Sequence, residues 1–215
     1  MSQTYDWYFD FISPFAYLQW RRLHRDFSVF RIQPKPILFA GLLKHWGQLG
    51  PAEIPGKRIH TYRIVLWQAH SVGIPLRFPP AHPFNPLPAL RLALAAKDIH
   101  LACDLIFKHI WEHGLAADTP EALQPVADAL GIEDLAACLA DPEVKNKLVQ
   151  NGEQALALKI FGVPTLVIHH QLFWGNDATE MAMQYIANPS MMDDDKEMKR
   201  INDLPEAIQR MTKQP

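Results

Sequence analysis

The residues with the clearest chemical potential are Ser13 and Pro14, where an aromatic, β-branched segment meets an apolar helical pattern. Serine is a preferred N-cap and proline suits the first helical position, so we expect a helix to begin at Ser13. Free backbone N–H groups and the helix dipole stabilise an anion at such a terminus. A serine hydroxyl there can donate a hydrogen bond to a bound thiolate. Taken alone, the same pattern is better explained as a plain helix cap.

A second chemical pattern is HIWEH at residues 109–113, which fits the HxxEH arrangement of inverted zinc proteases. Its two histidines, four residues apart, share one face of a helix. However, Gly114 follows at once and ends the helix, and no further ligand is evident. We therefore expect no metal here, and we interpret these histidines, like the pair at 169–170, as surface or core residues.

Three elements must position Ser13. Residues 4–12 are aromatic and β-branched without a helical stripe, which indicates a strand buried on both faces. The helix that begins at Ser13 is followed by residues 29–37, which favour a second strand ending at its prolines. From about 40 to 60 the chain is rich in Gly and Pro, which predicts a long loop.

The next hundred residues have mainly helical periodicity. Within them, 118–121 (DTPE) resembles a capping box, and Asp141-Pro142 repeats the arrangement of N-cap and first helical residue. Residues 165–174 then predict a β-hairpin with its turn near 170–171, and a final helix follows.

This order, strand–helix–strand, helical block, strand–strand–helix, is that of the thioredoxin fold with an insertion between its halves. The predicted class is α/β, with a thioredoxin-like domain of residues 1–56 and 159–215 and an all-helical insertion domain of residues 57–158. In this fold the reactive group lies where the first strand leads into the first helix, which here is Ser13. Redox members have CxxC at that place, whereas residues 13–16 are Ser-Pro-Phe-Ala. Disulfide exchange by the protein's own thiols is thereby excluded there, and the natural external thiol is glutathione.

Two later segments fit a glutathione site. Pro164 is the expected cis-proline of the fold, although a proline is also usual at the start of a strand. A cis bond presents the backbone N–H and C=O of Val163 to an extended peptide. Asn176 and Asp177 begin the last helix, where a carboxylate could hold the cationic γ-glutamyl amine. A plain cap explains Asn176 and Asp177 about equally well.

Five segments occur in a specific order: YFDFISPFAYL (8–18), PGKR (55–58), NPLPALR (85–91), FGVPT (161–165) and LFWGND (172–177). Together they resemble 2-hydroxychromene-2-carboxylate isomerases and the related kappa-class glutathione transferases over nearly the whole chain. The resemblance implies a DsbA-like thioredoxin domain with a helical insertion, glutathione as cofactor, and a homodimer.

By this resemblance, Ser13 matches the serine beside the glutathione sulfur. Val163 and Pro164 match the backbone clamp for the cysteinyl residue, and Asn176 and Asp177 match the γ-glutamyl site.

The remaining matches are less direct. Lys57 matches a basic residue near the glycyl carboxylate. Asn85 and Arg91 match residues of the helical domain that contact substrate, and Arg91 is either a carboxylate ligand or part of a structural ion pair. The family usually has Gly-Asn in the loop where this chain has Gly47-Gln48, so an amide would reach the site from Gln48 on a longer side chain.

The implied activity is glutathione-dependent isomerisation of an aromatic 2-hydroxychromene-2-carboxylate to trans-o-hydroxybenzylidenepyruvate, a step of naphthalene breakdown. The resemblance implies that the thiol adds reversibly to a conjugated carbon and is regenerated. The alternative is a kappa-type glutathione transferase or peroxidase, or a glutathione-binding module without chemistry.

The bulk properties agree with a compact enzyme. The 215 residues are 48% hydrophobic with a formal charge of −2. A chain of this size and composition can bury a substantial hydrophobic core, and it has no basic stripe of the kind that binds nucleic acid. No signal-peptide pattern and no apolar run of roughly 20 residues is present, so we expect a cytoplasmic protein without membrane contact. Cys103 and Cys138 lie outside any CxxC motif, and we expect single thiols, although their spacing permits a disulfide.

Overall fold

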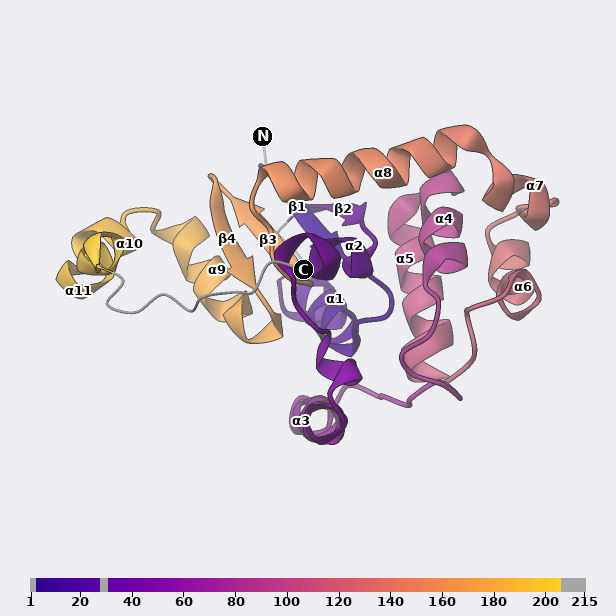
Figure 1. Cartoon of the computed structure of the whole chain (residues 1–215), viewed down its shortest axis with the longest axis horizontal. Coiled ribbons are helices and arrows are strands. Elements are labelled where there is room, and N and C mark those ends of the chain that lie inside the picture. The colour runs from indigo at the N-terminus through magenta and orange to yellow at the C-terminus, as the bar shows by residue number, and fades with distance from the viewer. Residues whose placement is uncertain (1–2, 28–30, 206–215) are drawn as a thin grey trace. The chain divides into compact units, whose positions relative to one another are not determined.

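The computed structural model of the chain describes residues 3–27 and 31–205. Internal contacts divide the chain into two compact units, Met1–Thr179 and Glu180–Pro215. The first unit contains the whole sheet and the helices inserted into it (Figure 1). The limits of the thioredoxin-like and helical domains given above stay a prediction.

The first unit begins with a strand–helix–strand unit, continues with helices and ends with two strands. In chain order its strands and α-helices are β1 (Thr4–Phe9), α1 (Pro14–Asp26), β2 (Arg31–Pro36), α2 (Phe39–Trp46), α3 (Pro55–Ser71), α4 (Leu87–Ala95), α5 (Ile99–Phe107), α6 (Pro120–Ala129), α7 (Leu135–Ala140), α8 (Pro142–Ala157), β3 (Thr165–Ile168) and β4 (Gln171–Trp174). This is the predicted α/β thioredoxin order with a helical insertion between β2 and β3, and the fold class is confirmed.

The four strands form one sheet in the order β2-β1-β3-β4. Strand β1 pairs in parallel with β2 and antiparallel with β3, and β3 pairs antiparallel with β4. Helices cover both faces. Trp7 of β1 stacks near Trp20 of α1 and Phe107 of α5, whereas Tyr8 packs on the opposite face with Leu42 of α2 and Ala155 of α8. Burial on both faces explains why β1 is an almost continuous apolar run.

Strand β2 ends at Pro36, as predicted, and it also contains Pro34. It is an edge strand, and the amide of Ile37 donates to the carbonyl of Phe9 in β1 at 2.9 Å. Amide directions alternate along a strand, so Pro34 and Pro36 lie where an N–H would face the open edge. Their missing donors therefore cost the sheet no hydrogen bond.

The predicted loop from 40 to 60 is wrong, because the segment contains the end of α2, a 3₁₀ turn at Pro51–Glu53 and the start of α3. Gly47 ends α2 in the left-handed conformation, with φ of +61°, and Pro55 occupies the first turn of α3. The Gly and Pro residues thus mark helix boundaries, which are also favoured places for these residues.

The β3–β4 hairpin is confirmed, with its turn one residue earlier than predicted. His169 and His170 are both left-handed, with φ of 47° and 71°, as a two-residue turn between right-twisted strands requires. Both side chains are exposed.

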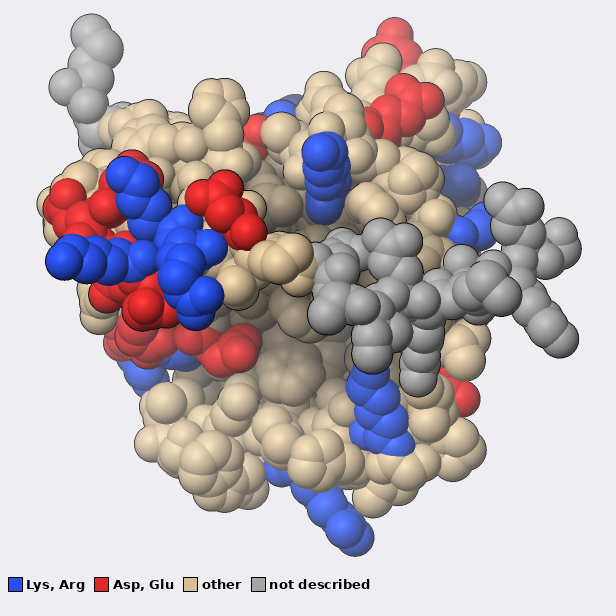
Figure 2. Space-filling model, turned by 60° about the vertical axis from the view of Figure 1, so that its left-hand side comes forward, with Lys and Arg blue, Asp and Glu red and all other residues tan. Residues whose placement is uncertain are grey.

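The second unit contains most of α9 (Thr179–Ala187), then α10 (Met191–Asp194) and α11 (Lys196–Arg200). Residues 193–197 are exposed, and Glu197 pairs with Arg200 at 2.8 Å. On the face shown in Figure 2, acidic and basic side chains gather in one mixed cluster, while several other Lys and Arg side chains stand apart. No helix in the described residues is long and apolar enough to cross a membrane.

Side-chain caps fix the starts of α5, α6, α7 and α8, whereas α3 and α4 begin without one. The predicted cap at Asp141 is confirmed, since its carboxylate accepts from the Glu143 amide at 2.8 Å at the start of α8. Helix α6 begins one residue later than the predicted capping box, because Thr119, not Asp118, accepts from the Ala122 amide at 3.3 Å.

This difference gives a stability test. Thr119→Ala removes the cap of α6 and is expected to lower the free energy of unfolding by about 1 kcal/mol. Asp118→Ala is the matched control and should change it by less than about 0.5 kcal/mol. Chemical denaturation measures both changes. An equal or larger loss of unfolding free energy in Asp118→Ala would show that Thr119 is not the cap of α6.

Candidate functional site

Ser13 lies at the junction between β1 and α1, and it is buried, with 9% of its surface exposed. The Ser13 amide donates to the Asp10 carbonyl at 3.1 Å, which closes a turn over the end of the strand. Its hydroxyl accepts from the Ala16 amide at 3.2 Å, as predicted for an N-cap. Pro14 follows as the first helical residue.

The cap determines what the hydroxyl can still do. Because Ser13 Oγ already accepts from Ala16, its own proton must be donated elsewhere, and no described residue accepts it. The Phe15 amide, at the second position of α1, likewise has no acceptor among the described residues. Two donors are therefore available at the positive end of a 13-residue helix, which is a suitable environment for an anion.

The Val163–Pro164 peptide bond is cis, as predicted. Tyr8 of β1 pairs with Thr165 of β3, which directly follows Pro164, so the cis bond lies next to the end of β1 that leads to Ser13. Neither the amide nor the carbonyl of Val163 has a hydrogen-bond partner within the described part of the chain. This backbone can therefore pair with an extended peptide.

The loop after β4 is tied to the same region by backbone and side-chain bonds. The Gly175 amide donates to the Pro164 carbonyl at 2.8 Å. From α1, the Gln19 amide group donates to the Gly175 carbonyl at 3.0 Å and to Thr179 Oγ1 at 2.9 Å, and it accepts from Trp7 Nε1 at 2.7 Å. Helix α1 thus holds Ser13 at its start and this loop two turns later.

Asn176 and Asp177 lie in that loop but have different surroundings. The buried Asn176 side chain accepts from Arg22 at 3.2 Å and donates to Gln68 at 3.3 Å, so its groups are used inside the protein. Asp177 is exposed at the start of a 3₁₀ turn, and its carboxylate folds over Gly175 where a Cβ would clash. The left-handed φ of +92° at Gly175 also favours glycine.

Asp10 is a fully buried carboxyl group directly before the Ser13 turn, and no functional role was predicted for it. Its oxygens accept from the amides of Ile12 at 3.1 Å and Phe39 at 2.8 Å. Burial raises the pKa of Asp10 from 3.8 to about 7, although the backbone N–H donors act in the opposite direction. A carboxylate directly after a run of aromatic residues, Trp7 to Phe9, was the available signal.

Exposed aromatic side chains lie beside the Val163–Pro164 segment. Phe161 and Trp174 are 40% and 52% exposed, and their ring centroids lie 5.2 Å apart in an edge-on arrangement. The Trp174 indole covers Gly162, where any side chain would clash with it. Such rings can contact a planar ligand bound next to the clamp.

The other predicted site residues are more scattered in their contacts. Gln48 and Lys57 are exposed, and neither side chain has a partner among the residues that the structure describes. Asn85 accepts from the Leu87 amide at 3.2 Å and so helps to begin α4. Arg91 Nη1 lies 3.5 Å from the Leu139 carbonyl in α7, with no ion pair to a described residue.

The residues of the HxxEH pattern are used in packing. His109 Nε2 lies 2.8 Å from the Ala116 carbonyl, and Glu112 lies 3.7 Å from Arg21 of α1. Residues 108–112 form a π-helical turn, and no group of three metal-binding side chains is found over residues 3–27 and 31–205.

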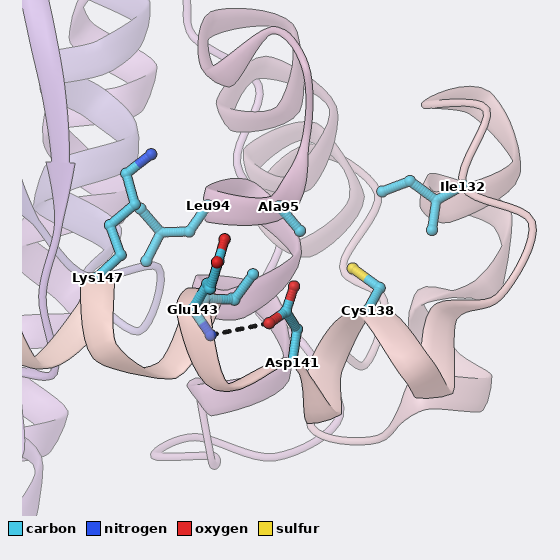
Figure 3. A pocket seen from close by; sticks show the side chains of 8 residues that line it. Leu94, Ala95, Ile132, Cys138, Asp141, Glu143 and Lys147 are labelled. Carbon is cyan, nitrogen blue, oxygen red and sulfur yellow. Dashed lines mark hydrogen bonds between the residues drawn. The ribbon is translucent and has the colours of Figure 1, made fainter.

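A pocket of about 450 Å³ lies between α4, α7 and α8, away from Ser13 (Figure 3). Its lining includes Cys138, Asp141 and Lys147. The Asp141 carboxylate is occupied by its cap to Glu143, and burial raises the pKa of the free Cys138 thiol. None of the predicted site residues lines this pocket, and it has no reactive group.

Comparisons with known proteins show the family of this chain. The chain belongs to the family of the DSBA-like thioredoxin domain, which matches residues 4–187. A 2-hydroxychromene-2-carboxylate isomerase from Sphingobium xenophagum is 27% identical over 196 residues, covering 86% of this chain and 99% of the relative. Glutathione S-transferase kappa 1 from Homo sapiens is 26% identical over 203 residues, covering 84% and 89%.

A solved structure of a 2-hydroxychromene-2-carboxylate isomerase matches with a TM-score of 0.76 at 23% identity, covering 95% of this chain and 100% of that one. The fold is therefore shared. The resemblance that the motifs indicated, to these isomerases and to kappa-class transferases, is confirmed.

Gln19 offers a test of how the site is assembled. Gln19→Leu leaves Trp7 Nε1 and the Gly175 carbonyl without their buried partner, so we expect the free energy of unfolding to fall by about 2 to 4 kcal/mol. Gln124→Leu, an exposed amide that bonds only to Asp128, is the control and should cost under about 0.5 kcal/mol. Denaturant titration decides, and equal effects would contradict the network.

Asp10 predicts a pH dependence of stability. A folded pKa of about 7, above the unfolded value of 3.8, means that the folded state holds a proton the unfolded state has lost. The stabilisation is complete below about pH 4 and is lost as the pH rises to about 7. Asp10→Asn removes this titration, so its unfolding free energy should change less with pH between pH 4 and 8 than that of the wild type. The same dependence on pH in both proteins would contradict the role of Asp10.

Proposed function

We propose that this protein is a glutathione-dependent enzyme that isomerises an aromatic acid of the 2-hydroxychromene-2-carboxylate type. The observation that carries the proposal is the buried Ser13 hydroxyl, which accepts its cap bond from Ala16 and has a proton that no described residue takes. A donor held in this way at a helix N-terminus suits a thiolate that the protein does not itself supply.

The donors and acceptors around Ser13 fit glutathione as a peptide. The unpaired amide and carbonyl of Val163 can bond its cysteinyl backbone in the manner of an added strand. The exposed Asp177 carboxylate suits the cationic γ-glutamyl amine, and the free Lys57 ammonium suits the glycyl carboxylate. Asn176 would act indirectly by fixing this loop, and Gln48 would contribute an amide at the edge of the site.

When bound, glutathione supplies a nucleophilic thiolate that adds reversibly to a conjugated carbon and allows rotation about the former double bond. The residues of this chain prepare that chemistry. Ser13 donates a hydrogen bond from its hydroxyl to the anion, and the Phe15 amide and the dipole of α1 add to the stabilisation. Because Ser13 is almost buried, these interactions act in a medium of low dielectric constant and are strengthened.

The aromatic part of the substrate would lie against Phe161 and Trp174, which flank the clamp with exposed rings. Asn85 and Arg91 are the proposed contacts from the helical insertion, and the Arg91 bond to Leu139 favours a supporting role. The homodimer and the cytoplasmic location stay predictions.

A kappa-type transferase is the second candidate, because human kappa transferase matches at nearly the same identity as the isomerase. Two assays, which both follow the concentration of free thiol, distinguish the two activities. An isomerase changes the ultraviolet spectrum of 2-hydroxychromene-2-carboxylate in the presence of glutathione without consuming thiol. A transferase consumes thiol with an electrophilic aryl halide. Thiol consumption without any isomerisation of 2-hydroxychromene-2-carboxylate would replace the isomerase assignment.

Ser13→Ala tests the thiolate site directly. Removal of the donor should raise the pKa of the bound glutathione thiol by about 1 to 2 units and lower kcat roughly a hundredfold. The thiolate absorbance of the complex, followed against pH, measures the first effect and steady-state kinetics the second. Thr119→Ala loses a comparable cap elsewhere and should leave both unchanged. Wild-type kinetics in Ser13→Ala would end the assignment.

A further inference from the structure

Two neighbouring carbonyls in the turn before Ser13 are held by side chains from the helical insertion. Trp111 Nε1 donates to the Phe11 carbonyl at 2.8 Å, and His82 Nε2 lies 2.8 Å from the Ile12 carbonyl. His82 belongs to the segment between α3 and α4, outside the helices. The β1–α1 turn is thus supported both by its own strand and by the inserted residues.

The surroundings of His82 define its protonation. A carbonyl only accepts, so Nε2 carries the hydrogen that is donated to Ile12. The other nitrogen, Nδ1, lies 2.6 Å from the Tyr62 hydroxyl, which also lies 2.9 Å from the His82 carbonyl. The Tyr62 hydroxyl has one hydrogen, which it donates to the His82 carbonyl, and the neutral Nδ1 is a second acceptor for the same hydrogen. The Ile12 carbonyl thus sets the tautomer, and Tyr62, from α3, holds His82 in place.

Packing holds the imidazole in this orientation. The rings of Tyr62, Phe78 and Trp111 lie edge-on to His82, with centroids 5.2, 6.1 and 5.5 Å away. Burial lowers the pKa of His82, and the Arg58 charge acts in the same direction, while the bond to Ile12 raises it. The neutral form required by the hydrogen bonds is favoured near pH 7.

One peptide plane connects His82 to Ser13. The carbonyl of Ile12 and the amide of Ser13 belong to the same planar peptide group. His82 holds the carbonyl end, and the Asp10 carbonyl holds the amide end at 3.1 Å. With both ends bonded, the plane cannot rotate, and the direction of the Ser13 side chain is set relative to the helix N-terminus.

We infer that His82, held by Tyr62, is a positioning residue for Ser13, and that its bond to the Ile12 carbonyl aims the Ser13 hydroxyl at the thiolate. This inference rests on the proposed function. His82 touches neither glutathione nor substrate in this role. It acts through the turn, so its loss changes how well the thiolate is stabilised more than how tightly glutathione binds.

Three variants separate the donor from the ring. His82→Phe keeps an aromatic ring and removes the donor. His82→Gln restores a donor, because its Nε2 is the same number of bonds from Cα as the histidine Nε2. Tyr62→Phe removes only the hydroxyl that holds His82 and keeps the packing of the ring.

The experiment titrates the thiolate absorbance of bound glutathione against pH for each variant, alongside kcat and KM. His82→Phe should raise the thiol pKa by about one unit and lower kcat about tenfold, with KM for glutathione changed much less. His82→Gln should recover most of both, and Tyr62→Phe should give a smaller shift in the same direction. A wild-type thiol pKa in His82→Phe, or an equal loss in His82→Gln, would overturn the inference.

A second measurement needs no glutathione. In wild-type protein, nitrogen NMR should find the Nε2–H tautomer of His82, and His82→Phe should move the amide resonances of Ser13 and Ala16 while His82→Gln preserves them. If the wild type bound no glutathione, the proposed function would fail, but these shifts would still show whether His82 positions the turn before Ser13. If His82→Phe did not fold, Tyr62→Phe would decide: unmoved Ser13 and Ala16 resonances would overturn the positioning role.

Discussion

The hydrogen bond from the Ala16 amide to Ser13 Oγ, 3.2 Å long, sets the direction in which the serine can act. A hydroxyl has one proton, and the cap uses the oxygen as an acceptor, so the proton is left for a group outside the helix. The same bond begins α1 and orients its N-terminal amides toward that group. Helix formation and anion binding at this place therefore depend on one contact.

Helix α1 also determines where the rest of the site lies. Gln19 and Arg22 extend from its later turns to Gly175 and Asn176, so the loop that carries Asp177 is attached to the helix that carries Ser13. These are polar groups in largely buried surroundings, and their cost is offset only when every donor and acceptor is paired. This pairing allows one position of the loop that carries Asp177, whereas apolar packing alone would allow several.

Local rules were sufficient for part of this account. The helix start at Ser13, the cap at Asp141 and the β3–β4 hairpin depend on short-range preferences that are visible in a single sequence. The cis bond before Pro164 was instead predicted from the order of the elements, which indicates the thioredoxin fold. The segment from 40 to 60 was misjudged because Gly and Pro favour helix boundaries as well as loops.

The roles of Gln19 and His82 could not be predicted from local patterns. Gln19 bonds to residues 12, 156 and 160 positions away, and His82 bonds to Ile12, 70 positions away, so these groups come together only in the folded chain. Gln19 is a polar residue on a buried helix face, and His82 lies in a proline-rich connection without periodicity. The clamp at Val163 depends equally on sheet register, which no local pattern gives.

The most direct test of the central claim is a crystal structure of the protein with glutathione. We predict that the sulfur lies within hydrogen-bond distance of Ser13 Oγ, with the cysteinyl backbone paired to Val163 and the γ-glutamyl amine near Asp177. Glutathione bound with its sulfur away from Ser13, or at another surface, would contradict it.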